Sequence, residues 1–496
     1  MMTSLTRPFS VWTLVLMAAG VGLAIPLRSA GPDPQAAAVS TARASATALD
    51  RYVAAPDPAF AWTVRSTLPS EGATTTLIDL TSQRWLTETE VEQPLWKHWL
   101  VVVTPPKVTS DTAMLFIGGG RNDRTPPTAP IQGLVDMARD TGTVVADLRM
   151  VPNQPVVFKN DPTRTPRIED DFIAYTWKHF LETGDDRWPA RLPMTKSAVR
   201  AMDAVTAFAR SSVGGGHMVN RFVVAGGSKR GLTTWMTAAT DRRVIAIAPM
   251  VIDVLNTVPS FTHHFRAYGT YTDAVKDYVD QGITDWIDTP EFRALMKIED
   301  PYEYRERLTM PKLLVNASGD QFFLPDSSRF YFDQLKGERH LRYVPNADHS
   351  LNNSDALGSV HAFYASIIRG TPRPEFSWTF ERDGAIKVVS KTRPESVTLW
   401  QATNPDARNF RLESIGPAYR SAALTPSGPN TWFGRVPAPT KGWTAYFVEL
   451  TFASGGTYPL KFTTAVRVLP DTLPFAAPVR TRAVGRSLIG RPSGPQ

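Results

Sequence analysis

The sequence predicts an α/β architecture, a mostly parallel sheet with helices on both faces, followed by a small C-terminal β-sandwich. From about residue 50 onward, short apolar runs alternate with longer stretches of helical spacing, which is typical of a parallel sheet covered by helices. After Gly370 the helical stretches stop, and short runs of alternating bulk continue to about residue 468. The first pattern places the α/β domain at residues 39–371, and the second places the sandwich at 372–470.

Seven runs in the α/β part are apolar enough to be strands inside a sheet. They span residues 100–104, 113–117, 143–147, 222–225, 244–250, 312–317 and 341–344. Two longer stretches, 153–193 and 256–310, interrupt the alternation and are rich in aromatic and charged residues. Insertions after sheet strands commonly cover a binding site, so both stretches are expected to form partly helical lids.

The two ends of the chain differ from the rest. Arg7 precedes an apolar run over 11–27, and small residues follow, which is the plan of a secretory signal peptide with a linker over 1–38. The run also nears the lower length limit of a membrane span, so a single uncleaved N-terminal membrane anchor is the alternative. In both cases we expect an exported protein, periplasmic or extracellular. The arginine-, proline- and glycine-rich end, 471–496, is expected to be disordered.

Composition excludes several classes of function. The chain of 496 residues contains no cysteine, which rules out cysteine nucleophiles and thiolate metal sites. The formal net charge is +7, but the 54 basic and 47 acidic residues are interspersed, so no nucleic-acid partner is expected. Metal-binding spacing such as H-E-x-x-H does not occur, and neither a metal nor an organic cofactor is expected.

The motif with the clearest chemistry follows the apolar strand 222–225 and reads Gly226-Gly-Ser-Lys-Arg-Gly231. A serine among small residues at a strand-to-helix turn is typical of the nucleophile elbow of α/β-hydrolases, which makes Ser228 the candidate nucleophile. Larger side chains in so tight a turn would strike the neighbouring strand and helix. The usual G-x-S-x-G pattern would have glycine at position 230, where this chain has arginine. The alternative is a glycine-rich turn with an incidental serine.

A nucleophilic serine needs a base, and the base needs a carboxylate that orients it. Asp320 follows one predicted strand, and His349 follows the next. Ser228, Asp320 and His349 thus occur in the chain order of α/β-hydrolases, each on a loop after a strand. Asp253, which follows an earlier strand, is the alternative acid.

Acyl transfer also needs N–H donors for the developing oxyanion. A glycine loop follows the strand 113–117, so the N–H groups of Gly119 and Gly120 are expected donors, together with that of Lys229 after the nucleophile. Arg121 and Asn122, which end the same loop, are candidates for contacts with substrate.

Two cationic side chains directly after the serine raise the question of substrate charge. Lys229 and Arg230 open the helix whose positive end faces the site, so a substrate carboxylate or phosphate would be attracted there. The alternative, given equal weight, is that both side chains form ion pairs with a lid.

Several short motifs give the chain a family resemblance. They are Leu49-Asp-Arg-Tyr-Val, Pro56-Asp-Pro, Val151-Pro-Asn-Gln-Pro, Arg167-Ile-Glu-Asp-Asp, Ala174-Tyr-Thr-Trp, Lys196-Ser, Gly226-Gly-Ser-Lys-Arg-Gly and Pro345-Asn-Ala-Asp-His-Ser. Over about residues 50–468 the chain resembles the PhoPQ-activated pathogenicity-related proteins of the PqaA type. The resemblance implies an α/β-hydrolase fold and a connection with virulence or signalling, without a substrate. Within these motifs, Glu169 and Asp170 provide either helix-start charge or an acidic clamp for a substrate amine.

The expected activity is hydrolysis of an ester or related acyl bond in a small-molecule substrate, with an anionic substrate as one option. A serine exopeptidase of the dipeptidyl-peptidase kind, acting on a peptide, would use the same three residues. A secreted virulence or signalling protein with a vestigial hydrolase site is the third alternative.

Overall fold

The structure, a computed structural model, describes residues 46–479 with the exception of residues 71 and 124. The predicted signal peptide or anchor and residues 480–496 of the predicted tail therefore lie outside the described residues. Within the described part, no helix combines the length and the apolarity that crossing a membrane requires.

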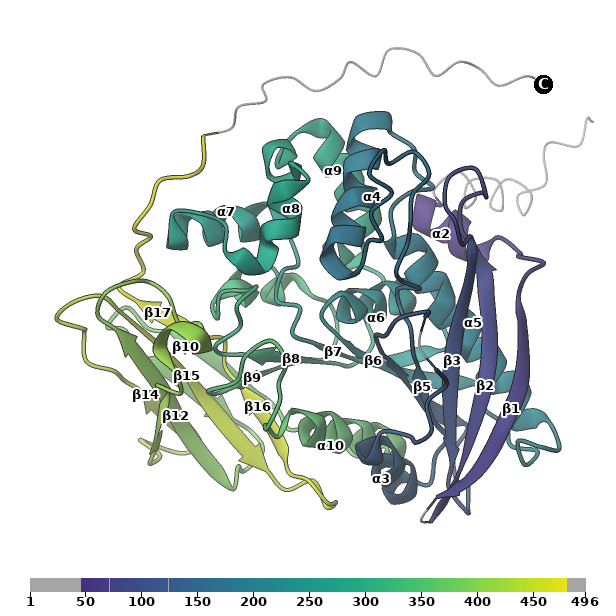
Figure 1. The fold of residues 1–496 in the computed structure, drawn as a ribbon. Coiled ribbons are helices and arrows are strands. Elements are labelled where there is room, and N and C mark those ends of the chain that lie inside the picture. The colour runs from purple at the N-terminus through teal and green to yellow at the C-terminus, as the bar shows by residue number, and fades with distance from the viewer. Residues whose placement is uncertain (1–45, 71, 124, 480–496) are drawn as a thin grey trace, which may run out of the picture. The chain divides into compact units, whose positions relative to one another are not determined.

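Six parallel strands form the centre of one continuous sheet (Figure 1). Their order is β5 (Val145–Leu148), β4 (Thr112–Ile117), β6 (Arg221–Gly227), β7 (Val244–Met250), β8 (Lys312–Ala317) and β9 (Arg339–Val344). Helices cover both faces, and β6 leads through Ser228 directly into a helix. These features confirm the predicted α/β-hydrolase fold.

Three antiparallel strands extend the sheet beyond β5, namely β3 (Leu95–Thr104), β2 (Ala73–Arg84) and β1 (Ala61–Ser70). The predicted strand 100–104 corresponds to the end of β3, whereas neither β1 nor β2 was predicted. Both contain threonine and other polar residues that interrupt an apolar run. Exposed residues alternate along β1, the strand at the edge of the sheet, whereas β2 is mostly buried and carries several of its polar residues inside.

Alternate residues of the central strands face two hydrophobic cores on opposite sides of the sheet. Leu115 and Val224 belong to one core, whereas Met114 and Val223 belong to the other. The first core is covered by α2 (Ala48–Ala54), α5 (Arg191–Arg210) and α6 (Lys229–Thr240), and the second by α3 (Gln132–Thr141) and α10 (Ala356–Arg369). The sheet therefore holds β6 and its serine turn between two packed layers.

The two stretches predicted as lids pack against each other on the same side of the sheet as α6 (Figure 1). The first contains α4 (Glu169–Thr183), and the second contains α7 (Thr257–Tyr268), α8 (Lys276–Asp280) and α9 (Pro290–Glu299). The ring of Trp177 lies 5.3 Å from that of Tyr278 and 6.3 Å from that of Phe292. The second stretch also contains the short 3₁₀ turns η1 (Asp273–Val275), η2 (Ile283–Trp286) and η3 (Pro301–Tyr304). Two more, η4 (Ser327–Phe330) and η5 (Phe332–Gln334), lie between β8 and β9.

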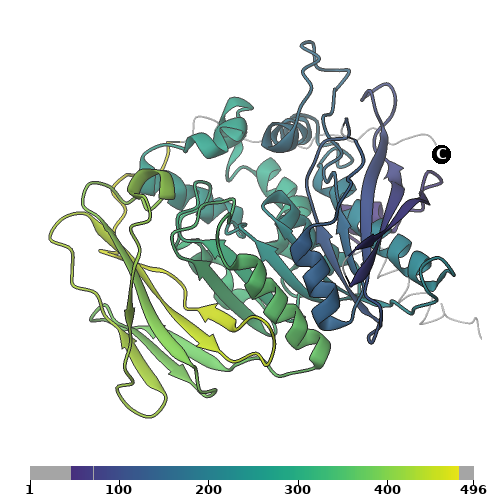
Figure 2. The ribbon, with the colours of Figure 1, turned by 60° about the horizontal axis from the view of Figure 1, so that its bottom comes forward.

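The C-terminal strands form two layers beside α10 (Figure 2). One is the sheet of β10 (Phe376–Phe380), β11 (Ile386–Ser390) and β14 (Thr431–Gly434). The other contains β12 (Ser396–Asn404), β13 (Arg420–Ala423), β15 (Trp443–Phe452), β16 (Leu460–Thr463) and β17 (Arg467–Leu469), with the short helix α11 (Leu412–Ile415) between β12 and β13. Because β16 pairs with β9, this second layer continues the central sheet.

The first residues of the predicted tail contact the rest of the fold. The Asp471 carboxylate pairs with Arg329 in η4 at 3.0 Å, and the Phe475 N–H donates to the carbonyl of Arg266 in α7 at 3.1 Å. Residues 471–475 therefore connect the C-terminal strands to the second lid stretch.

Candidate active site

Ser228 occupies the turn between β6 and α6 in a conformation that side chains rarely adopt, with φ 56° and ψ −128°. Its N–H donates to the Met250 carbonyl of β7 at 2.8 Å, which fixes the turn against the neighbouring strand. A Cβ on Gly226 would lie 2.8 Å from the Arg230 carbonyl, and one on Gly231 would lie 2.8 Å from the Ile252 side chain. A side chain at position 231 would therefore collide with the end of β7. Glycine is needed at 231, and arginine is accommodated at 230.

His349 and Asp320 are brought together by the loops after β9 and β8. His349 Nδ1 donates to Asp320 Oδ2 at 2.8 Å, and Asp320 Oδ1 accepts from the N–H of Phe322 at 2.7 Å. The imidazole packs on the Phe322 ring with centroids 4.3 Å apart, while the His349 N–H donates to Gln321 Oε1 at 3.0 Å. With Nδ1 as donor, Nε2 keeps a lone pair. This nitrogen is buried and has no hydrogen-bond partner in the described part of the chain.

Asp253, the alternative acid, has other partners. Its carboxylate is buried and accepts the hydroxyls of Tyr331 at 2.5 Å and Tyr343 at 2.6 Å. Burial raises the pKa of Asp253 to about 7; the two tyrosine hydrogen bonds oppose this rise, and repulsion from Asp320 adds to it. The structure thus orients His349 with Asp320 and places Asp253 in a separate tyrosine-bound site.

Register between the central strands brings the serine turn and the other two loops to one edge of the sheet. Gly227 of β6 lies opposite Met250 of β7, and Met250 lies opposite Val315 of β8. The last residues of β8 and β9 are also paired. Ser228, Asp320 and His349 all leave the sheet at this edge, although within the described residues no hydrogen bond joins Ser228 Oγ to His349.

The glycine loop after β4 lies beside the serine turn, because Ile117 is paired with Gly226. The carbonyls of Gly118, Gly119 and Gly120 are all hydrogen-bonded to residues that follow β5. The carbonyl of Gly118 accepts from Val151 N–H at 3.1 Å and that of Gly119 from Met150 N–H at 2.9 Å. Gln154 Nε2 donates to the third, that of Gly120, at 3.2 Å.

The N–H groups of Gly119 and Gly120 point away from the bonded carbonyls of Gly118 and Gly119. The reason is that the C=O of one residue and the N–H of the next point in opposite directions in a planar trans peptide unit. The N–H groups of Gly119, Gly120 and Lys229, predicted as oxyanion donors, have no acceptor among the residues that the structure describes. They are therefore available to a ligand oxygen.

Lys229 and Arg230 both pair with the start of α4. Arg230 makes a bidentate pair with Glu169 at 2.7 and 2.9 Å, and Lys229 Nζ lies 2.8 Å from Glu169 and 3.2 Å from Asp170. Burial alone would raise the pKa of Glu169, but the Arg230 hydrogen bond and the charges of Arg230 and Lys229 hold it well below its usual range. The two cationic side chains thus form ion pairs with two carboxylates of the first lid stretch, as the second alternative predicted. Because these charges compensate each other, the structure favours neither a binding site for a substrate anion nor an acidic clamp for a substrate amine.

Arg121 has a partner within its own loop, and Asn122 has partners in the segment that follows β5. Arg121 Nη2 pairs with Asp123 at 2.8 Å on the surface. The Asn122 N–H donates to the Gln154 carbonyl at 2.6 Å, and Asn122 Nδ2 lies 3.4 Å from Asn153 Oδ1. The structure thus places both residues at the end of the glycine loop, where they form hydrogen bonds to Asp123 and to residues 153–155.

Three contributions to the site were missed by the sequence analysis. Arg191, which is 1% exposed, donates to the Lys229 carbonyl at 2.7 Å and pairs with Glu299 at 3.3 Å, so it supports the start of α6. Gln154 bonds both Gly120 and Glu169. The tyrosines on Asp253 are the third. Gln154 lay inside a family motif, whereas no local pattern marked the others.

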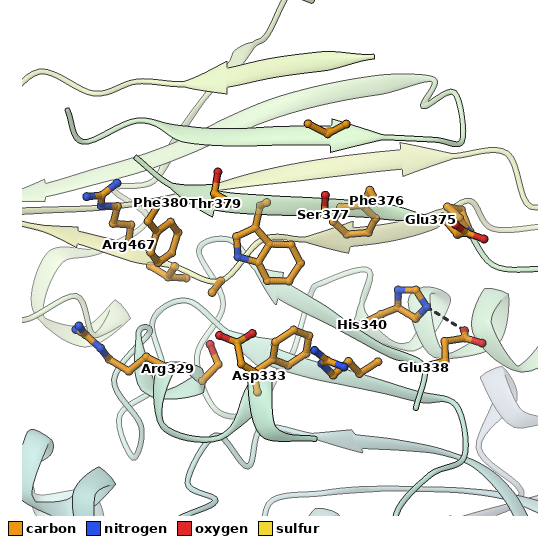
Figure 3. Close-up of a pocket in the computed structure, with 18 of the residues that line it drawn as sticks. Arg329, Asp333, Glu338, His340, Glu375, Phe376, Ser377, Thr379, Phe380 and Arg467 are labelled. Carbon is orange, nitrogen blue, oxygen red and sulfur yellow. Dashed lines mark hydrogen bonds and ion pairs between the residues drawn. The ribbon is translucent and has the colours of Figure 1, made fainter. Parts of the chain in front are cut away.

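A surface groove of about 1370 Å³ contains none of the three residues Ser228, Asp320 and His349. It runs between β10 and the segment from η4 to the start of β9. Figure 3 shows Phe376 and Phe380 on one wall and Arg329 and Asp333 on the other. A smaller cavity of about 330 Å³ lies beside α7.

Comparison with known proteins gives a family match over most of the chain. The family described as PhoPQ-activated pathogenicity-related protein matches residues 49–411. Autocrine proliferation repressor protein A of Dictyostelium discoideum is 37% identical over 468 residues, which cover 88% of this chain and 94% of that protein.

Solved structures of similar fold are more distant. Acetyl xylan esterase 1 from a Thermoanaerobacterium species has a TM-score of 0.43 at 12% identity and covers 65% of this chain and 91% of its own. Glucuronoyl esterase from Solibacter usitatus has a TM-score of 0.37 at 13% identity, with the same shares. The acylaminoacyl peptidase of Pyrococcus horikoshii has a TM-score of 0.37 at 12% identity and covers 62% of this chain and 49% of its own. The likeness at these identities concerns the fold only.

Proposed function

This chain belongs to the PhoPQ-activated pathogenicity-related protein family, and we propose that it is an exported serine hydrolase that cleaves an ester or related acyl bond. One observation supports the proposal above others. His349 donates through Nδ1 to the buried Asp320, while its buried Nε2 has no partner in the described part of the chain, at the sheet edge that carries the strained Ser228. A base held in this tautomer has its lone pair free for a nucleophile's proton.

The reaction proceeds in two halves. His349 Nε2 takes the proton of Ser228 Oγ as that oxygen attacks the acyl carbon, and the negative charge develops on the carbonyl oxygen. N–H groups of Gly119, Gly120 and Lys229 donate to that oxygen. The imidazolium, stabilised by Asp320, then gives its proton to the departing alcohol oxygen. Water then attacks the acyl carbon while His349 Nε2 takes one of its protons. The bond between that carbon and Ser228 Oγ breaks, and the imidazolium returns the proton to Oγ, which releases the free acid and restores the enzyme.

The charges around the serine turn bear on the class of substrate. Because Lys229 and Arg230 are paired with Glu169 and Asp170, neither a substrate carboxylate nor a substrate amine finds an uncompensated partner there. We therefore expect an uncharged ester or acyl group near the scissile bond, and no preference for dipeptide-like substrates with a free amine.

A second candidate function is signalling without catalysis. It rests on the name of the Dictyostelium discoideum relative, which describes a repressor of proliferation, and on the missing hydrogen bond between Ser228 and His349 within the described residues. In that case the site would be vestigial.

A fluorophosphonate probe separates the two functions, because it reacts only with an activated serine. We expect the folded protein to be labelled, Ser228→Ala to lose the label, and Ser211→Ala, at the end of α5, to keep it. Hydrolysis of p-nitrophenyl esters should exceed that of dipeptidyl anilides. Folded wild-type protein that neither labels nor hydrolyses any ester would refute the enzymatic proposal and favour signalling.

A further inference from the structure

The side chain that departs from the usual elbow motif lies against the glycine loop. We propose that Arg230 is a positioning residue that fixes the loop 118–120. It thereby keeps the N–H groups of Gly119 and Gly120 directed at the oxyanion, the substrate oxygen that becomes negatively charged when Ser228 attacks the acyl carbon. This inference rests on the proposed function and adds to it the means by which the oxyanion donors are held.

The guanidinium of Arg230 packs on Gly119. A Cβ on Gly119 would lie 2.5 Å from Arg230 Nη2 and 2.9 Å from its Cζ, so the glycine leaves the space that the guanidinium fills. On its other edge, Arg230 Nε donates to the carbonyl of Val151. Val151 N–H in turn holds the Gly118 carbonyl at 3.1 Å. Arg230 therefore contacts the loop directly and also holds the segment to which the loop is bonded.

Two residues of the first lid stretch keep Arg230 in place. Glu169 binds both terminal nitrogens of the guanidinium, at 2.7 and 2.9 Å. Gln154 accepts from the Glu169 N–H at 2.7 Å, donates to the Glu169 carboxylate, and donates to the Gly120 carbonyl at 3.2 Å. A planar, bidentate ion pair is rigid compared with one made by lysine.

The contacts unite three family motifs that are far apart in the sequence. Val151-Pro-Asn-Gln-Pro supplies the bonded carbonyl and Gln154, the motif at 167–171 supplies Glu169, and the serine motif supplies Arg230. An oxyanion donor acts only if it is aimed at the position of the developing charge, and small displacements reduce the rate strongly. Arginine at 230 thereby acquires a role that glycine could not fill.

The test compares Arg230→Met with a matched control, Arg373→Met. The Arg373–Glu338 pair is also bidentate and similarly buried, with 13% of the Arg373 side chain exposed against 12% for Arg230. It lines the groove beside β10, which contains none of Ser228, Asp320 and His349. For p-nitrophenyl acetate we expect Arg230→Met to lower kcat about 10–100-fold with KM within about threefold. Arg373→Met should retain wild-type kcat, and thermal unfolding should show similar midpoint losses for both variants.

A thionoester of the same acyl group gives a readout that a structural role would not move. Sulfur accepts hydrogen bonds poorly, so an intact oxyanion site favours the oxygen ester, and this preference should shrink in Arg230→Met but not in Arg373→Met. Arg230→Lys, which keeps the charge beside Glu169 but loses the planar contacts, should recover the unfolding midpoint without recovering kcat.

The possible results separate the two proposals. If Arg230→Met and Arg230→Lys retain wild-type kcat and the wild-type preference for oxygen, the positioning role is wrong while the hydrolase proposal stands. Should Arg230→Met fail to fold, Arg230→Lys decides the same comparison. If wild-type protein neither labels with fluorophosphonate nor hydrolyses esters, the hydrolase proposal fails first and the positioning role falls with it.

Discussion

Asp253 makes stability depend on pH in a way that a single substitution should remove. The carboxyl group is buried between Tyr331 and Tyr343, and burial raises its pKa from 3.8 to about 7. Asparagine has nearly the same shape and no charge in this range. We therefore expect Asp253→Asn to behave like a wild-type protein in which Asp253 stays protonated at every pH.

The sign follows from proton binding. Between pH 4 and 7 the folded protein keeps the Asp253 proton while the unfolded chain has lost it, so the free energy of unfolding falls as pH rises. The stabilisation is fully present below the unfolded pKa and is lost as pH passes the folded pKa. A pKa moved from 3.8 to about 7 corresponds to about 4 kcal/mol over this interval. Relative to wild type, Asp253→Asn should gain that amount between pH 4 and 8.

Urea unfolding of both proteins at half-unit steps from pH 4 to 8 measures this difference. Subtracting the two curves cancels the titration of all groups that the substitution leaves unaffected. A difference that stays constant within about 1 kcal/mol would show that Asp253 is ionised throughout, and the account of its burial would be wrong. A difference of the opposite slope would mean that the tyrosine hydrogen bonds outweigh burial.

Three further predictions concern the site and its support. Asp320→Asn should lower kcat for p-nitrophenyl acetate about 10⁴-fold, because an amide no longer holds the imidazole in its donor tautomer. Gly119→Ala should lower kcat about tenfold in wild type but less than about twofold in Arg230→Met, because the added methyl collides only with the guanidinium. Glu299→Ala leaves the buried Arg191 without its carboxylate and should lower the free energy of unfolding by about 3–5 kcal/mol in urea.

Each of these has its own contrary result. Asp348→Asn alters a carboxylate beside His349 that bonds Ser350 instead, so it serves as the control for Asp320→Asn, and equal losses would contradict the assigned orienting role. Equal effects of the alanine in both backgrounds would show that Gly119 and Arg230 are not coupled. A loss under 1 kcal/mol for Glu299→Ala would mean that water reaches the guanidinium.

The pattern of apolar residues along the sequence predicted the central parallel strands, and the loops after these strands supplied the three candidate catalytic residues. Strands inside a parallel sheet must be apolar on both faces, and loops at their carboxyl ends gather at one edge, so Ser228, Asp320 and His349 could be placed together from spacing alone. The same reasoning overlooked β1, in which exposed residues alternate, and β2, in which mostly buried polar residues interrupt the apolar run. It also left Asp253 and Asp320 as rivals, since both follow strands of the same sheet.

Only the tertiary structure decided which groups the charged side chains near Ser228 contact. Whether Arg230 faces a substrate or a carboxylate depends on Glu169, which is 61 positions away in the chain, and no periodicity links the two. Likewise, Asp253 is distinguished from Asp320 by tyrosines 78 and 90 positions downstream. The sequence by itself determined the fold class and marked Ser228 as the candidate nucleophile, because apolar periodicity and tight-turn sterics act over short range. The tertiary structure decided which charges are already satisfied, because ion pairs and hydrogen bonds are set by proximity in space.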